Sequence, residues 1–268
     1  MEEALLTFVI PVRHQENAKD WGLLKRRLSE TITSISGQSS DLWRCIIVAN
    51  EGADLPPLPS NFSAARVTLP PNPMHERAGA DLHAFYESVR LDKGSRVLAG
   101  VRASKSKYVM VVDDDDFIDR NLVKFVSDNQ DKNGWFFKSG FVWEDGGKHV
   151  YRHPRFNHFC GTSHIVKRSL LNVPEQGDVD IEYVKRMLGS HMTIERELAE
   201  NGTPLEPLPF EGAVYRIGHA GAHSRSQTLA KTFFLRRSTL LRPWRVIGAL
   251  TRIRRLDRPM ARRFFGVQ

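Results

Sequence analysis

The chain has 268 residues, of which 41% are hydrophobic and 26% charged, so it can bury the core of one large domain and is not a disordered protein. Its two cysteines, Cys45 and Cys160, lie far apart and form no CxxC pair, which argues against a disulfide framework and a thiolate zinc site. The formal charge of +8 is concentrated at one end, because residues 225–268 contain 12 Lys/Arg and one acid, whereas the rest has 27 basic and 30 acidic residues.

Strands and helices alternate along the first part of the chain. Apolar helical spacing predicts helices at 20–38 and 94–107. This order favours an α/β fold with an open sheet, in which ligands bind beyond the carboxyl ends of the strands. Apolar runs rich in β-branched residues predict the strands, at 5–12 (LLTFVIPV), 43–52 (WRCIIVANEG), 65–69 (ARVTL) and 108–112 (YVMVV).

The second half is less regular. Residues 134–152 contain aromatic runs around an EDGG turn and predict a hairpin. Residues 160–171 (CGTSHIVKRSLL) indicate a strand that leads into a short helix. Residues 180–202 have helical character and are expected to form two helices that are separated near Gly189.

Four consecutive aspartates, Asp113 to Asp116, follow the predicted strand at 108–112. Like charges this close are unfavourable without a countercharge, and a divalent cation supplies one. Mg²⁺ and Mn²⁺ prefer oxygen ligands, so an Asp-x-Asp at a strand end can hold a metal that clamps a diphosphate. The alternative is a solvated acidic turn in which Asp116 or Asp119 caps the next helix.

The order of these segments resembles the GT-A nucleotide-sugar glycosyltransferases, particularly the family-2-like group. The match is sharpest over residues 92–118 (DKGSRVLAGVRASKSKYVMVVDDDDFI), where a Gly/Arg-bearing helix precedes a hydrophobic strand and a D-x-D-D ending. The resemblance implies a GT-A (Rossmann-like), mostly parallel sheet flanked by helices. It implies a domain at 1–224, and residues 225–268 would then be a basic, amphipathic, helical C-terminal extension.

The resemblance also implies the site residues. Alternatives for some of them are an exposed helix start at Lys93 and Arg96 and exposed loop histidines at 219 and 223. The metal would be Mn²⁺ or Mg²⁺, with candidate ligands Asp113, Asp115, His219 and His223. The nucleotide and its diphosphate would be bound by Pro11, Val12, Arg13, Asn50, Glu51, Lys93, Arg96, Asp113 and Asp114.

An inverting transfer needs a general base that removes the proton of the acceptor hydroxyl. In the family this base is usually an Asp or Glu that opens the helix after the acceptor segment, and Ser190 and His191 stand at that place. His191 is one candidate because an imidazole titrates near neutrality, and a capping or buried histidine is its structural alternative. The nearby carboxylates Asp178, Asp180 and Glu182 are the other candidates.

These features predict a metal-dependent glycosyltransferase that moves a sugar from a nucleotide-diphosphate sugar donor to a glycan or lipid-linked acceptor. The resemblance implies inversion and a role in surface polysaccharide or glycolipid synthesis. One alternative is a nucleotidyltransferase that uses a sugar phosphate. Another is a non-catalytic glycan- or membrane-binding protein of the same fold, which the missing acidic pair at Ser190 and His191 keeps open.

The N-terminal sequence lacks the basic and apolar regions of a secretory signal, and no apolar run reaches the roughly 18 residues of a membrane span. We therefore expect a cytoplasmic protein. The basic segment 225–268 interleaves arginines with Phe, Leu, Ile and Trp, which favours peripheral binding to an anionic membrane surface at its inner face. A helix packed on the body ranks second and nucleic-acid binding third.

Overall fold

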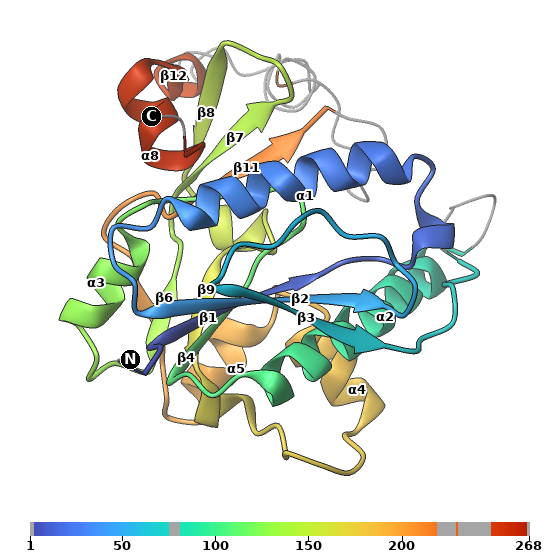
Figure 1. Ribbon diagram of the computed structural model, residues 1–268. Helices are drawn as coiled ribbons and strands as arrows, with labels where there is room; N and C mark the ends of the chain where they lie inside the picture. The colour runs from blue at the N-terminus through green and yellow to red at the C-terminus, as the bar shows by residue number, and fades with distance from the viewer. Residues whose placement is uncertain (1–2, 75–80, 219–228, 230–247, 267–268) are drawn as a thin grey trace.

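The computed structural model describes residues 3–74, 81–218, 229 and 248–266, and two β-sheets form its centre (Figure 1). Six of the seven strands in the larger sheet run in one direction, and β9 alone is antiparallel to its neighbours. The predicted α/β class, with a mostly parallel sheet flanked by helices, is confirmed. In sheet order the strands are β10 (Glu206–Pro207), β6 (Gly134–Phe136), β9 (His164–Lys167), β4 (Tyr108–Val111), β1 (Leu6–Pro11), β2 (Trp43–Asn50) and β3 (Phe62–Val67).

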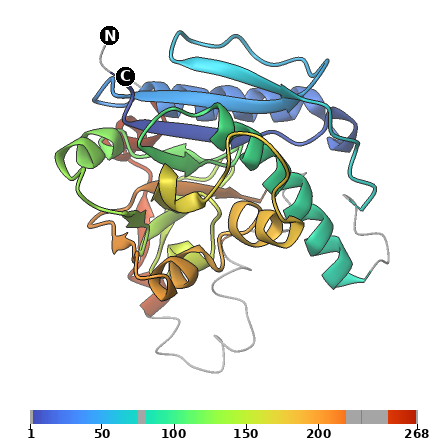
Figure 2. The same cartoon turned by 90° about the horizontal axis from the view of Figure 1, so that it is seen from below.

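Different helices cover the two faces of this sheet, because alternate residues of each strand point to opposite sides. Phe8 of β1 belongs to the apolar cluster that includes α1 (Trp21–Ser36) and α3 (Leu122–Asp128). Val9, the next residue, belongs to the cluster of α2 (Leu82–Ala103), η4 (Val184–Leu188) and α5 (Ile194–Glu200) on the other face. Figure 2 shows α2 beside η4 and the preceding α4 (Ile181–Tyr183) on that face.

Helix α2 (Leu82–Ala103) begins 12 residues before the predicted helix at 94–107. Asp81 starts it, since its side chain accepts a hydrogen bond from the backbone N–H of His83 at 3.0 Å. The early turns bury Phe85 but otherwise lack an apolar stripe, which is why helical spacing did not reveal them. Lys93 therefore lies in the interior of a helix and not at its start.

The smaller sheet contains the predicted hairpin, formed by β7 and β8, whereas the GWF run at 134–136 joins the larger sheet as β6. The predicted break near Gly189 is confirmed, and the 160–171 segment forms β9 followed by a short helix. In sheet order the smaller sheet has β12 (Ile253–Arg255), β8 (His149–His153), β7 (Gly140–Glu144), β11 (Ala213–Ile217) and β5 (Phe117–Ile118).

Short helices complete the described fold. Among the described residues, no helix is long and apolar enough to cross a bilayer. These helices are η1 (Gln15–Asn17), η2 (Phe156–His158), η3 (Arg168–Leu171), α4 (Ile181–Tyr183), the π-helical turn η4 (Val184–Leu188), α5 (Ile194–Glu200) and α8 (Arg258–Phe264).

The described end of the predicted C-terminal extension packs onto the body. Strand β12 pairs with β8, and the Phe264 ring of α8 is fully buried in the cluster that contains Phe117 and Phe141. Arg263 also forms an ion pair with the buried Asp119. Residues 248–266 thus belong to the same folded body, and the expected boundary at 224/225 lies outside the described residues.

Candidate functional site

The four aspartates form a turn directly beyond β4. The turn is closed by the backbone N–H of Asp116, which donates to the carbonyl oxygen of Asp113 at 3.2 Å. On the other side, the N–H of Asp113 donates to the hydroxyl of Thr162 at 2.9 Å. Because residues 114 and 115 turn and do not continue the strand, Asp113, Asp114 and Asp115 all reach one cavity.

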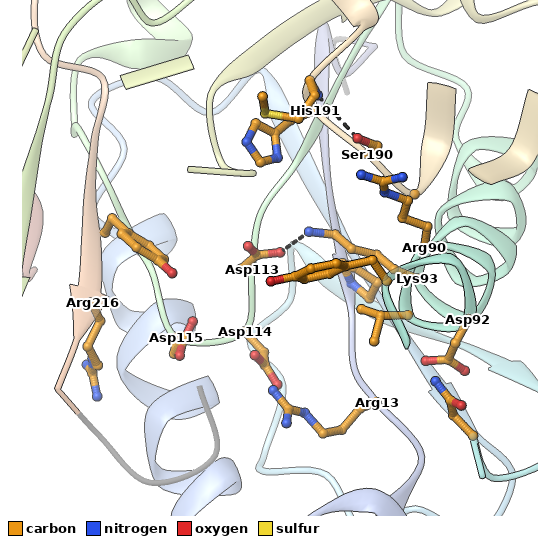
Figure 3. A pocket seen from close by; sticks show the side chains of 17 residues that line it. Arg13, Arg90, Asp92, Lys93, Asp113, Asp114, Asp115, Ser190, His191 and Arg216 are labelled. Carbon is orange, nitrogen blue, oxygen red and sulfur yellow. Dashed lines mark hydrogen bonds and ion pairs between the residues drawn. The ribbon is translucent and has the colours of Figure 1, made fainter. Parts of the chain in front are cut away.

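This cavity has a volume of about 360 Å³ and lies where β1 and β4 end (Figure 3). Its position is the one expected for ligands of a parallel sheet. The lining comes from six segments of the chain: Pro11 and Arg13; Asn72; Tyr86, Val89, Arg90, Asp92 and Lys93; Asp113, Asp114 and Asp115; Gly189, Ser190, His191 and Met192; and Tyr215 and Arg216.

Lys93 and Asp113 form an ion pair at the centre of the cavity, with Nζ and Oδ1 2.5 Å apart. Burial opposes the charge of Lys93, but the Asp113 carboxylate outweighs that cost and raises the pKa of Lys93 above its usual value. Gly161 packs against the pair, since a Cβ there would lie 2.9 Å from Nζ and 3.0 Å from Oδ2. A larger residue at this position would push the ends of these side chains aside.

Arg13 and Asp114 lie on one side of that ion pair (Figure 3). Burial, with the charges of Asp115 and Asp113, raises the pKa of Asp114 to about 6, while Arg13 and Lys93 act in the opposite direction. Repulsion among the aspartates is thus partly relieved by the nearby cations. A bound cation or a phosphate-bearing ligand would alter this balance directly.

Asp116 has a structural role, because its side chain is fully buried. One carboxyl oxygen accepts from the backbone N–H of Arg216 at 3.1 Å and the other from the Cys160 thiol at 3.4 Å. Burial and the charges of Asp115 and Asp113 raise its pKa well above the usual value. Asp116 therefore ties the aspartate turn to β11 and to the 156–164 segment.

His191 and Ser190 lie on the opposite side of the cavity from Arg13 (Figure 3). Burial and, next, the Lys93 ammonium lower the pKa of His191 to about 4, while Asp113 acts in the opposite direction. The Nε2 atom of His191 is buried and has no hydrogen-bond partner in the part of the chain that the structure describes. The ring is therefore neutral at pH 7.

Two glycines bring His191 to this place. A Cβ at Gly94 of α2 would lie 2.5 Å from the carbonyl oxygen of Val184, and one at Gly189 would collide with the carbonyl of Arg90. The backbones of α2 and η4 are therefore in direct contact. This contact holds residues 190–192 over the cavity, next to Lys93.

Several residues implied by the resemblance lie elsewhere. Arg96, Asn50 and Val12 are buried behind the cavity, and the Arg96 guanidinium contacts the Asp92 carboxylate at 2.9 Å and the Asn50 amide oxygen at 2.6 Å. Arg96 and Asn50 thus form a buried polar link between α2 and β2. Neither residue lines the cavity, so neither is placed to contact a nucleotide bound there. Glu51 is exposed and does not line it.

The carboxylate candidates for the general base are also outside the lining. Asp180 is exposed and caps α4 by accepting from the Tyr183 N–H at 2.9 Å. Glu182 forms an ion pair with Lys185 at 2.7 Å, and Asp178 is exposed. His219 and His223 lie outside the described residues. Of the base candidates, His191 is the one that lines the cavity.

Sequence reasoning missed Arg90. It lines the cavity one helical turn before Lys93 and is paired with Glu87 at 2.8 Å. The i, i+3 spacing of two cations would have indicated a shared face if the helix had been extended back to residue 82. Arg216 was also missed, because its place in the cavity depends on the pairing of β11 with β5 and β7.

The cavity contains some of the oxygen donors that Mn²⁺ or Mg²⁺ requires. Among the described residues, no three His, Cys, Asp or Glu side chains gather into a metal-binding group. Asp113 and Asp115 nevertheless supply carboxylate oxygens to one cavity. They fit a cation that takes one or two protein carboxylates and completes its shell with substrate phosphates and water.

Comparisons with known proteins give structural similarity only. No protein-family model and no curated protein sequence matches the chain. Residues 1–349 of S. aureus TarS are similar at a TM-score of 0.47 and 11% identity, over 79% of this chain and 60% of that one; further TarS structures contain UDP or UDP-GlcNAc. The chain spans 37% of the longer TarS structure.

Two other structures have lower scores. Rv0371C of Mycobacterium tuberculosis, in complex with manganese, has a TM-score of 0.36 at 10% identity, over 80% of this chain and 92% of that one. The 4-diphosphocytidyl-2C-methyl-D-erythritol synthase of Anaerococcus prevotii has 0.37 at 10%, over 93% and 97%. Since these TM-scores are below 0.5, the functional proposal rests on the site itself.

Proposed function

We propose that the protein is a glycosyltransferase of the GT-A, family-2-like type, which transfers a sugar from a nucleoside diphosphate sugar. The observation that carries this proposal is the cavity beyond β1 and β4, which combines Asp113 and Asp115 with Lys93 and with His191. Displacement of a diphosphate needs anion neutralisation at the leaving group and a base at the nucleophile. The cavity offers both on opposite sides.

The donor binds through its diphosphate. Arg13, Arg90 and Lys93 line the cavity and supply three cations, of which the guanidinium groups can contact phosphate oxygens in pairs. A bound Mn²⁺ or Mg²⁺ would be held by Asp113 and Asp115 and would supply charge neutralisation at the diphosphate. Arg96 is not part of this set, because its guanidinium is buried against Asp92 and Asn50.

The acceptor approaches His191. Its neutral imidazole accepts the hydroxyl proton while the hydroxyl oxygen forms a bond to the anomeric carbon and the nucleoside diphosphate departs with the electrons of the broken bond. Attack from the side opposite the leaving group gives inversion. Met192 and Tyr86, which are 50% and 47% exposed, border the same cavity and would contact a glycan or lipid-linked acceptor.

Exposed arginines between residues 252 and 262 support an acceptor at an anionic membrane, in surface polysaccharide or glycolipid synthesis at the inner face. Leu250, which precedes them in the sequence, is 54% exposed. Cationic and apolar groups together suit the boundary between headgroups and acyl chains. The exposed arginines are Arg252, Arg254, Arg255, Arg258 and Arg262.

Calorimetric titration with UDP, GDP, CDP and dTDP, each with and without Mn²⁺, tests the donor assignment. We expect one diphosphate to bind in a manner that depends on Mn²⁺, and Asp115→Ala to weaken that binding at least tenfold because a metal-bound carboxylate is lost. Asp131→Ala, at an exposed aspartate, is the control and should bind as the wild type does.

The same titration separates the alternatives. A nucleoside triphosphate that binds while every diphosphate fails, with pyrophosphate released from it and a sugar phosphate, would replace the proposal with a nucleotidyltransferase. A folded protein that binds none of these nucleotides would leave the non-catalytic binding protein.

A further inference from the structure

The Lys93 ammonium occupies the position beside Asp113 that a divalent metal ion would take. We propose that in the ligand-free protein Lys93 blocks the carboxylate that the divalent metal needs, and that the diphosphate of the donor draws Lys93 away and so opens Asp113 to the metal. This inference rests on the proposed function, since it assigns an order to the binding of metal and donor in the same cavity. Lys93 is then an exchangeable group with two successive anionic partners.

The contacts around Asp113 leave a cation little access. Oδ1 is held by Lys93 at 2.5 Å, and the Asp113 side chain is 28% exposed. The Asp113 backbone is fixed by the Thr162 hydroxyl, so the carboxylate cannot be carried away by a shift of the main chain without loss of that bond. A metal therefore reaches Asp113 when the ammonium leaves.

Lys93 is able to leave. Its side chain is 26% exposed, so the ammonium can leave Asp113 without crossing a closed protein interior. The lysine side chain is a flexible chain of four carbons, and its terminal ammonium group can move to a new anionic partner. A diphosphate carries more negative charge than one carboxylate, and it enters a cavity already lined by Arg13 and Arg90.

The exchange makes metal and donor binding mutually dependent. Without nucleotide, Mn²⁺ must displace Lys93 at the full cost of the ion pair, so its affinity is low. With nucleotide present, the ammonium is neutralised by phosphate and the carboxylate becomes a ligand. Reciprocity of linked binding requires that Mn²⁺ strengthen donor binding by the same factor.

Mn²⁺ binding measured by electron paramagnetic resonance, with no nucleotide present, tests the block. Lys93→Met keeps the length of the side chain and removes the ammonium, and we expect it to bind Mn²⁺ about tenfold more tightly than the wild type. Arg90→Met removes a cation from the same cavity but not from Asp113, and its smaller gain measures the general effect of charge. Lys185→Met is the control for an ion-paired lysine outside the lining.

Equal gains for Lys93→Met and Arg90→Met, or no gain for Lys93→Met, would overturn the proposal. Should Lys93→Met unfold, Lys93→Gln provides the same comparison, and thermal melts identify the folded variants. Asp113→Asn added to Lys93→Met should abolish the gain, because the freed carboxylate is then gone. If the proposed function is wrong, the wild type binds no nucleoside diphosphate in the calorimetric titration, a result that is independent of the Mn²⁺ measurements.

Discussion

His191 owes its chemical state to its surroundings. Burial and the Lys93 ammonium favour the neutral ring, and the lone pair of a buried, unpartnered nitrogen remains available to a ligand. A base with a low pKa is weak in the free protein. When a diphosphate neutralises Lys93, one cause of the low pKa of His191 is removed and the ring becomes a stronger base.

Replacement of His191 separates proton transfer from donor binding. We expect His191→Ala to reduce the rate of sugar transfer by about 10²–10⁴-fold, the usual contribution of a general base, while the affinity for the nucleoside diphosphate changes little. Transfer is measured with the donor that calorimetry identifies, and His149→Ala, at an exposed histidine of β8, is the control. Unaltered transfer by His191→Ala would remove His191 from the mechanism.

The protonation of His191 has a defined direction with pH. Because its pKa lies at about 4, below the ordinary 6.5, the ring stays neutral and able to accept a proton between pH 4 and 6.5, where an exposed histidine is already charged. In NMR spectra, the ring resonance that His191→Ala removes should titrate near pH 4 in the ligand-free protein. Titration near 6.5 would contradict the buried environment.

The sequence predicts several charged residues of the cavity correctly but not the full set of residues that line it. The resemblance to GT-A enzymes implies Asp113, Lys93 and Arg13 as donor-binding residues, and all three line the cavity. The same resemblance implies Arg96 as a second diphosphate-binding cation beside Lys93. On a helix, residues three apart are neighbours yet differ by 60° in direction, and that difference sends Arg96 into the core.

At the scale of elements, the contact between α2 and η4 decides where His191 lies. Gly94 and Gly189 face backbone atoms of the other segment, so the two are packed without an intervening side chain. The π-helical form of η4 places Ser190 and His191 directly after the contact. Gly94 and Gly189 have no functional side chain, yet they determine where the imidazole of His191 lies.

Gly189→Ala tests this coupling. The added methyl group collides with the Arg90 carbonyl, and we expect the free energy of unfolding to fall by about 2 kcal/mol, as in other overpacked sites, together with a loss of sugar transfer. Urea denaturation and transfer assays measure the two effects. Gly248→Ala has open space around its Cβ and serves as control; a Gly189→Ala protein with full stability and activity would show that the contact yields easily.

Elements with strong local signals were predictable, and those defined by tertiary contacts were not. The buried strands β1, β2 and β4 are continuous apolar runs, and the hairpin of β7 and β8 has a glycine-rich turn. The first half of α2 is mostly polar and is stabilised by the Asp81 cap and by packing at Phe85. Such a helix has no stripe for periodicity to detect.

At the scale of the whole molecule, the C-terminal helix joins parts that are remote in sequence. The hydroxyl of Ser34 in α1 donates to the Phe264 carbonyl at 2.5 Å, and Arg263 pairs with Asp119 beyond β5. Composition alone could not reveal this, because a basic amphipathic segment has the same pattern whether its apolar side meets a membrane or a protein core. In α8 the buried apolar residue is Phe264.

Phe264→Ala measures how much α8 contributes to the fold. The ring is fully buried among aromatic side chains, so its removal should lower the free energy of unfolding by about 3 kcal/mol. Urea denaturation of the full chain is the measurement, with Leu250→Ala, at an exposed position, as control. A loss below about 1 kcal/mol would mean that α8 is only loosely attached to the body.

The hydrogen bond from the Cys160 thiol to Asp116 makes this cysteine a reporter of local opening. Both cysteines of the protein are buried, and burial raises the pKa of the Cys160 thiol well above its usual value, so the reactive thiolate is scarce in the folded state. An alkylating reagent reaches Cys160 only after the 156–164 segment has moved away from the aspartate turn. The modification rate of Cys160 in the unaltered protein therefore reports how often this segment separates from the aspartate turn, and a ligand that holds the turn in place slows it.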